Sequence, residues 1–214
     1  MRRALPPLRS NRSDLVVLGA MLLALAVVLA SALASKKVDA ATQVTKTFNK
    51  PQQILIPAGS FSTCALGPTE GKAAPYPSQL SIGSFPAGTT ILDVNLKLRR
   101  FTHGTPDDVG VLLSKGDRSR LVMDHVGGQS GVSSPVTNIT LTLDDEAANS
   151  LPEESQLEGG VFKPTNGFNT IESLSTFDGT NPNSTWKLRV VDHVSGECGD
   201  LEDGWSLIIR AKVP

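Results

Sequence analysis

The chain has 214 residues, which suits one domain with an appendage, and its 19 Gly and 14 Pro predict many turns and short elements rather than long helices. Residues 1–40 hold six Lys+Arg and two Asp+Glu, so residues 41–214 hold 14 and 19, a formal net charge of −5. Nucleic-acid binding would need a basic patch. The nearest candidate, Lys97, Arg99 and Arg100, alternates with apolar residues and is interpreted as a solvated strand face.

The N-terminal segment is typical of an exported protein. Residues 15–35 carry no charge and end near the small-residue pattern Ala32-Leu33-Ala34, as an export signal does. The segment is also long enough to span a bilayer as a helix. The basic residues before it favour an N-terminus in the cytoplasm: Arg2, Arg3, Arg9 and Arg12. Cleavage of a signal and retention as a single-pass anchor both stay open, and either places the remaining chain outside the cell.

Residues 36–47 are interpreted as a polar tether. Cys64 and Cys198 follow in the exported part, where an oxidising compartment favours one disulfide between them. The loop that it would close is long, and the entropic model then gives about 5 kcal/mol of stabilisation. Two separate free thiols are the alternative.

Alternating apolar and polar residues predict half-buried strands along the exported chain. In residues 91–101, Leu92, Val94, Leu96 and Leu98 share one face. Residues 109–114 and 119–125 predict two shorter strands around a turn at 115–117. Residues 138–144 predict another strand, with Ile139, Leu141 and Leu143 inward. With Gly- and Pro-rich turns between them, these strands predict an all-β fold, a β-sandwich or jelly roll, over residues 41–214.

The last third of the chain contains both tryptophans. In residues 186–192, Trp186, Leu188 and Val190 face inward, and in residues 205–213 Trp205, Leu207 and Ile209 do so. We expect the two segments to form a final hairpin joined by an acidic, Gly-rich loop. Each Trp begins its strand on the core side, where it buries a large area and still reaches a hydrogen-bond partner at the rim. Exposed tryptophans that stack on sugars are the alternative.

This region resembles the end of the P domain, also called the P/Homo B domain, which follows the catalytic domain in subtilisin-like proprotein convertases of the kexin and furin type. The resemblance extends over residues 48–213 and is most specific in its last third. The matching residues there are Phe177, Gly179, Asn183, Thr185, Trp186, Leu188, Val190, Asp192, Gly196, Gly199, Leu201, Trp205 and Leu207.

The resemblance implies a jelly roll of about eight strands, a galactose-binding-like sandwich, preceded here by the N-terminal hydrophobic helix. It implies a module without catalytic residues that packs against a protease domain and supports its stability, calcium dependence and pH response. No protease domain precedes the module in this sequence, and the cysteine pair does not map onto the family pattern. Phe177, Trp186, Leu188, Trp205 and Leu207 are the expected core.

Acidic turns are the candidate metal site. Calcium takes six to eight oxygen ligands from carboxylates and loop carbonyls. The candidate ligands lie at expected strand ends: Asp107, Asp108, Asp144, Asp145, Asp192 and Asp200. Asp side chains that close turns through their own hydrogen bonds are the alternative. His103, His125 and His193 are interpreted as loop histidines, because their spacing does not indicate that they converge.

The expected function is therefore an exported, non-catalytic module that stabilises or binds another protein, with a separately encoded subtilisin-like protease as the partner that the resemblance suggests. A cell-surface carbohydrate-binding jelly roll is the alternative from another class. A third possibility is a protease accessory linked to serine-peptidase activity only by domain association.

Overall fold

The structure is a computed structural model that describes residues 42–59, 70–128, 134–166 and 170–214. In these ranges the chain forms two β-sheets, each of seven strands, and two short 3₁₀ helices, η1 (Pro106–Asp108) and η2 (Leu174–Phe177). One continuous core lies between the sheets. The expectation of an all-β sandwich is thus confirmed.

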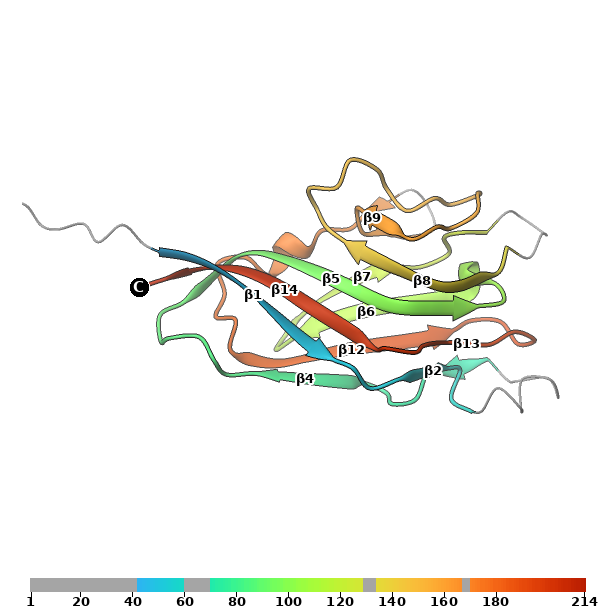
Figure 1. The fold of residues 1–214 in the computed structure, drawn as a ribbon, viewed down its shortest axis with the longest axis horizontal. Helices are drawn as coiled ribbons and strands as arrows, with labels where there is room; N and C mark the ends of the chain where they lie inside the picture. Colours follow the sequence, from blue (N-terminus) through green and yellow to red (C-terminus); the bar gives the residue numbers. More distant parts are fainter. Residues whose placement is uncertain (1–41, 60–69, 129–133, 167–169) are drawn as a thin grey trace, which may run out of the picture. The chain divides into compact units, whose positions relative to one another are not determined.

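The first sheet, called sheet A here, is nearest the viewer in Figure 1 and has its strands in the order β1, β14, β5 and β8, with β9 beyond β8. Neighbouring strands are antiparallel except β8 and β9. Its strands are β1 (Thr42–Lys50), β2 (Ile54–Ile56), β5 (Thr90–His103), β8 (Val136–Leu143), β9 (Gly160–Phe162), β13 (Gly199–Leu201) and β14 (Trp205–Val213).

Two strand positions in sheet A are each filled by two consecutive short strands, β13 with β14 and β1 with β2. β14 and β13 both pair with β5, from Trp205 opposite Leu98 to Leu201 opposite Phe101, with a turn at 202–204 between them. β1 pairs with β14 along its whole length, and β2 pairs with β13. Sheet A therefore presents β5 at its centre, with the β13–β14 line on one side and β8 on the other.

The second sheet, sheet B, lies behind sheet A in Figure 1 and is built around β12, which pairs with β6 on one side and with β3 and β4 on the other. β6 and β7 form the expected hairpin. Its strands are β3 (Gly71–Lys72), β4 (Ser78–Ile82), β6 (Val109–Lys115), β7 (Arg118–Met123), β10 (Thr165–Asn166), β11 (Thr170–Ile171) and β12 (Ser184–Asp192).

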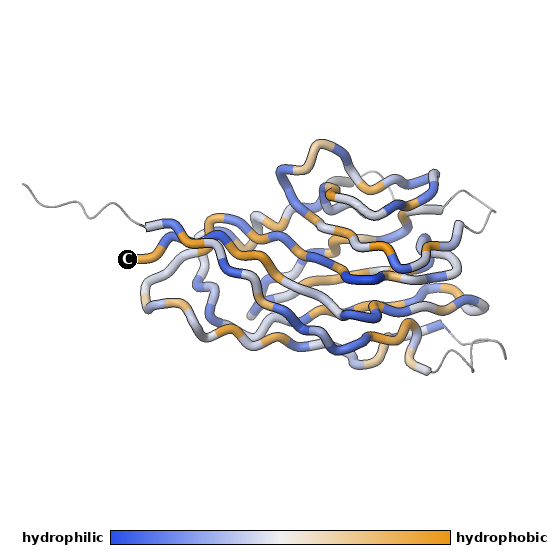
Figure 2. Tube along the Cα trace, viewed as in Figure 1, coloured by the Kyte–Doolittle hydropathy of each residue, from blue (hydrophilic) through white to orange (hydrophobic). Residues whose placement is uncertain are grey.

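The core follows from the alternation of hydropathy along the strands, visible as alternating colours in Figure 2. Trp186 and Trp205 are both 0% exposed, so neither presents a ring to solvent as a sugar platform. The indole Nε1 of Trp186 donates to the carbonyl oxygen of Pro182 at 3.2 Å, and that of Trp205 donates to Ser78 Oγ at 2.9 Å. The other expected core residues, Phe177, Leu188 and Leu207, are buried as well.

β5 departs from strict alternation at two places. Between Ile91 and Asp93 the pairing with β14 shifts register, so Ile91, 1% exposed, takes the core position that we expected for Leu92. At Arg100 the backbone turns left-handed, with φ of 53°, and the register against β8 shifts again. An extra residue in one strand reverses which side chains face inward. Phe101 and His103 are therefore buried after Val94, Leu96 and Leu98.

Two expectations about connectivity were wrong. The tether predicted at 36–47 overlaps β1, because Thr42–Lys50 pairs residue for residue with β14. The final hairpin does not form, because β12 lies in sheet B and β14 in sheet A. The acidic connection crosses between the sheets and contributes β13 on the way. Alternation identifies the buried face of a strand but not its neighbour.

Within the ranges described above, no helix is both long enough and apolar enough to cross a bilayer. The predicted export segment at 15–35 lies outside these ranges, as does Cys64, so both the N-terminal helix and the Cys64–Cys198 disulfide stay predictions.

Candidate functional site

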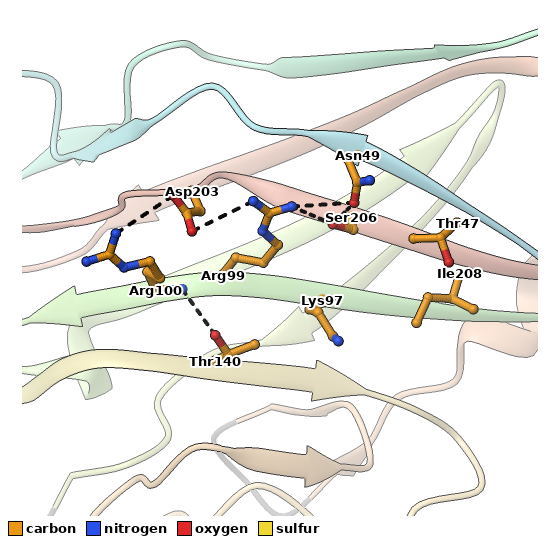
Figure 3. Close-up of a pocket in the computed structure, with 9 residues that line it drawn as sticks. All are labelled: Thr47, Asn49, Lys97, Arg99, Arg100, Thr140, Asp203, Ser206 and Ile208. Atoms are coloured by element: carbon orange, nitrogen blue, oxygen red, sulfur yellow. Dashed lines mark hydrogen bonds and ion pairs between the residues drawn. The ribbon is translucent and has the colours of Figure 1, made fainter.

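A hollow of about 410 Å³ lies on the outer face of sheet A, and we call it the sheet A groove. Its lining comes from β1, β5, β8, β14 and the turn before β14, as Figure 3 shows. The lining residues are Thr47, Asn49, Lys97, Arg99, Arg100, Thr140, Asp203, Ser206 and Ile208. Three cations and one carboxylate are among them, within a part of the chain that is acidic as a whole.

Strand register explains why these residues meet. Asn49 is paired with Ser206 across β1 and β14, and Ser206 is paired with Lys97 across β14 and β5. The three side chains therefore form a row across the sheet on its outer face. Lys97 and Arg99 alternate with the buried Leu96 and Leu98, so the two cations point outward from the same strand.

Arg99 is held in a fixed orientation. Its Nη1 lies 3.4 Å from both Asn49 Oδ1 and Ser206 Oγ, and its Nη2 lies 3.8 Å from Asp203 Oδ2. The Ser206 hydroxyl also donates to Asn49 Oδ1 at 2.7 Å, which links β14 to β1 beneath the guanidinium. Only 25% of the Arg99 side chain is exposed.

Arg100 lies beside Arg99 because of the left-handed bulge. Its guanidinium lies 2.8 Å from Glu202 Oε2 and 3.9 Å from Asp203 Oδ1. Its Nε donates to Asn138 Oδ1 at 2.7 Å, and its backbone N–H donates to Thr140 Oγ1 at 3.3 Å. The carboxylate of Asp203 thus lies between two guanidinium groups, as Figure 3 shows.

Lys97 differs from both arginines. Its ammonium group makes no hydrogen bond or ion pair with the part of the chain that the structure describes, and no dashed line reaches it in Figure 3. The side chain is half-buried on the floor of the groove. A cation held in a hollow without a counter-charge can accept an anionic group from another molecule.

A second assembly lies at the end of β5 and joins His103 to Asp192. The side chains of both residues are 0% exposed, and His103 Nε2 lies 3.3 Å from Asp192 Oδ2. His103 Nδ1 lies 2.9 Å from the carbonyl oxygen of Thr105. The other carboxylate oxygen of Asp192 accepts the backbone N–H of Val194 at 3.2 Å. Both ring nitrogens of His103 already have protein partners, so the pair ties β5 to β12 across the sandwich.

The other two histidines lie near the same end, which the sequence spacing did not reveal. The rings of His125 and His193 stack with centroids 5.5 Å apart, and His193 Nε2 lies 3.1 Å from Asp124 Oδ1. Gly110 lies beside His193 and Asp124, because an added Cβ there would come within 3.0 Å of both side chains. About 40% or more of each of the two histidine side chains is exposed.

The six aspartates expected to bind calcium fall into three groups. Asp107 and Asp108 in η1 and Asp192 at the end of β12 lie on the His103 side, where burial, and then the charges of Asp192 and Asp107, raise the pKa of Asp108. Asp144 and Asp145 follow β8, near the start of β5. Asp200 lies in β13, and Gln53 Nε2 donates to its carboxylate at 2.5 Å.

Asp144 and Asp145 are too far from the other four aspartates to share one site with them, because Asp200 pairs opposite Thr102 at the His103 end of β5. Asp93, near Asp144 and Asp145, and His103 at the end of β5 are ten residues apart, about 33 Å along an extended strand. In the described ranges, no three His, Cys, Asp or Glu side chains are arranged to hold a metal ion. The six residues therefore do not fit a single calcium site, and calcium binding itself stays a prediction.

Carboxylates also gather around Asp178, at the end of η2. Asp178 has its pKa raised to about 6, first by burial and then by the charges of Asp93 and Asp145, against the opposing charge of Arg210. Its Oδ1 is buried and has no hydrogen-bond partner in the described part of the chain. Asp145, by contrast, accepts hydrogen bonds from Ser173 Oγ and from the backbone N–H groups of Leu174 and Ser175, and so caps η2.

Lys115 forms a further polar contact near a smaller hollow of about 360 Å³. It is 8% exposed, and its Nζ donates to Thr180 Oγ1 at 2.6 Å and to the carbonyl oxygen of Asn181 at 2.8 Å. Burial, and then the charge of Arg118, lower its pKa. These bonds fasten the β6–β7 turn to the loop before β12.

Sequence reasoning identified the cations of the groove but not the groove. Lys97 and Arg99 do lie on an exposed strand face, as expected. Thr47, Asn49, Asp203 and Ser206 join them from segments that are distant in sequence, and only knowledge of which strands pair could have brought them together.

No protein-family model matches the chain, and no curated protein matches its sequence. The resemblance to the P/Homo B domain therefore depends on the motif residues alone.

Proposed function

We propose that this chain is an exported, non-catalytic β-sandwich module of the P/Homo B type that binds a protein partner, with a separately encoded subtilisin-like protease as the expected partner. In this proposal the sandwich is a jelly roll, and residues 15–35 deliver it to the outer face of the cell membrane or into the medium. The sheet A groove is the observation that carries the proposal, because it offers oriented polar and charged groups on an otherwise regular sheet face.

The structural roles of the motif residues support the resemblance. Phe177 packs on Trp186 with ring centroids 4.9 Å apart. The side-chain amide of Asn183 accepts from the backbone N–H of Phe85 at 3.1 Å and donates to its carbonyl oxygen at 2.8 Å. Gly179 has a φ of 71°, which favours glycine. Residues that determine the packing of a module are those that a family of such modules would share.

Carbohydrate binding is the alternative, and the lining of the groove argues against it. Sugar rings commonly stack on aromatic side chains, and no aromatic residue is among those that line the groove. Both tryptophans are buried in the core. A glycan ligand would depend on hydroxyl and amide contacts alone.

The test is affinity capture of the tagged full-length protein from its native cell surface, followed by a fluorophosphonate probe that labels active serine hydrolases. We expect a labelled subtilisin-like protease to co-purify, and its inactivation on heating to slow when the module is added. Labelling of the chain itself would assign it an intrinsic serine-hydrolase activity. Retention on glycan beads without any hydrolase would favour the carbohydrate-binding alternative.

A further inference from the structure

Among the described residues that line it, the sheet A groove has an excess of positive charge. Lys97, Arg99 and Arg100 line it, and Asp203 is the one carboxylate among the lining residues that the structure describes. Glu202, just outside the lining, is occupied by Arg100 at 2.8 Å. The ammonium of Lys97 has no carboxylate partner within residues 42–59, 70–128, 134–166 and 170–214, although residues 41–214 have a formal net charge of −5. An anionic ligand would complement this groove.

The spacing of the cations indicates the form of that ligand. Lys97 and Arg99 are two residues apart on one strand, so their Cα atoms are about 6.6 Å apart and their side chains point from the same face. An extended polypeptide repeats its side chains on one face at the same interval. Acidic residues at alternate positions of such a segment would match the two cations in register.

Asp203 shows how a carboxylate is accommodated in the groove. It lies between the guanidinium groups of Arg99 and Arg100, 3.8 Å and 3.9 Å away, and 45% of its side chain is exposed. Ion pairs at such exposed positions are weak and exchange readily. A ligand carboxylate can therefore replace Asp203 between the arginines while a second one binds Lys97.

The remaining lining suits a peptide backbone. Thr47, Asn49, Thr140 and Ser206 supply hydroxyl and amide groups that can donate to main-chain carbonyls or accept from main-chain N–H groups. An acidic polysaccharide would bring carboxylates as well, but the lining offers its sugar rings no aromatic surface. The observations therefore favour an acidic polypeptide over an acidic glycan.

We propose that the sheet A groove binds an extended, acidic segment of a protein partner, with Glu or Asp at alternate positions whose carboxylates pair with Lys97 and with the Arg99–Arg100 pair. This inference rests on the proposed function only in that the partner is a protein. It adds the chemistry that the partner must present and the conformation in which it binds.

Two capped peptides of equal composition test the register. Glu-Ser-Glu-Ser-Glu places its carboxylates on one face of an extended chain, whereas Glu-Glu-Ser-Ser-Glu has no pair two residues apart. We expect the full-length protein to bind the alternating peptide about fivefold more tightly, as measured by titration calorimetry at low salt, and to lose most of that affinity in 0.5 M NaCl. Equal affinity for the two peptides, or no binding of either, would overturn the proposal.

Three variants distinguish binding in the groove from non-specific electrostatic attraction to the protein. Lys97→Gln should weaken binding of the alternating peptide about fivefold, because one ion pair is lost. Asp203→Asn should strengthen it by a similar factor, because the carboxylate that competes with the ligand for Arg99 and Arg100 is then removed. Lys212→Gln is the control, because Lys212 is exposed on β14 about 20 Å from the Ser206 position and should change the affinity little. Melting curves confirm that each variant is folded.

The outcomes distinguish this inference from the proposed function. If Lys97→Gln weakens binding of the alternating peptide as expected while no protease co-purifies with the wild-type protein, the groove assignment stands and the protease-module proposal fails. If a protease co-purifies equally well with Lys97→Gln and no peptide binds, the module binds through another surface and the groove assignment fails. If polygalacturonate binds more tightly than the peptide and Lys97→Gln removes that binding, the groove binds acidic glycans instead, and the polypeptide assignment is overturned.

Discussion

Arg100 and Asn138 face each other across β5 and β8 with left-handed backbones, at φ of 53° and 55°, and Arg100 Nε donates to Asn138 Oδ1 at 2.7 Å. Both residues lie where the register between these strands shifts, between Leu98 and Phe101 and between Phe101 and His103. The paired bulges turn His103 into the core toward Asp192 and place Arg100 beside Arg99 in the groove. The core and the candidate site thus depend on the same irregularity.

The first prediction concerns this bulge. Asn tolerates the left-handed region, and a β-branched residue does not. Asn138→Val should therefore lower the free energy of unfolding by about 2 kcal/mol. Asn138→Gly loses the same hydrogen bond from Arg100 but adopts positive φ freely, so it should cost less, under about 1 kcal/mol. Urea unfolding measures both. Thr137→Val, at an exposed neighbouring position of β8, is the control, and equal losses in Asn138→Val and Asn138→Gly would contradict the conformational argument.

The second prediction concerns the hydrogen bond between the sheets. Trp205 Nε1 donates to Ser78 Oγ at 2.9 Å, and both side chains are buried. Ser78→Ala leaves the indole N–H without a partner and should lower the free energy of unfolding by about 1–3 kcal/mol. Ser81→Ala, on the exposed face of the same strand, should change it by less than about 0.5 kcal/mol.

A double-mutant cycle assigns this loss to the pair. Trp205→Phe removes the donor, so adding Ser78→Ala to it should cost less than Ser78→Ala does in the wild-type protein. Strict additivity of the two changes would show that Ser78 stabilises the protein in some other way.

The alternation of side chains predicted which residues fill the core but not how the strands are arranged. Trp186, Leu188, Trp205 and Leu207 were expected to be buried because an apolar residue at every second position defines a face, and they are. The sequence did not predict that Ile91, rather than Leu92, faces the core, because the bulge responsible is a property of two paired strands. β1 was not predicted as a strand, because an edge strand with one exposed face can be largely polar.

The candidate sites were less predictable, because they depend on tertiary contacts. Lys97 and Arg99 were recognised as an exposed face, while Asn49 and Ser206, which orient Arg99, are 157 residues apart in the sequence. His103 and Asp192 are 89 residues apart, and nothing local indicates that they pair. The expected calcium ligands were selected as strand-end aspartates, and strand ends occur at both ends of a sandwich.

The third prediction tests calcium, which the sequence suggested and which the positions of the six aspartates do not support as a single site. If the native state binds the ion, the melting temperature must rise with calcium concentration, by the amount that ligand linkage requires. From the sequence we expect a rise in millimolar calcium relative to chelator. Identical transitions in the two conditions would remove calcium from the proposed module, and magnesium at the same concentration controls for ionic strength.

The fourth prediction concerns the pH dependence of stability at Asp178. Its pKa rises from 3.8 to about 6 in the folded protein, chiefly through burial and then through Asp93 and Asp145. The native state therefore holds this proton more tightly than the unfolded chain does. The contribution of Asp178 to stability is fully present below pH 4 and is lost as the pH rises through 6.

Asp178→Asn should remove this dependence, because an amide does not ionise. We expect the variant to exceed the wild-type protein in free energy of unfolding by about 1 kcal/mol at pH 7, after allowance for solvent screening, and to lose that advantage near pH 4. Urea unfolding at pH 4, 5.5 and 7 measures the difference. Glu158→Gln, at an exposed position, is the matched control. A stability difference between Asp178→Asn and wild type that is the same at all three pH values would show that the carboxylate of Asp178 is not under electrostatic strain.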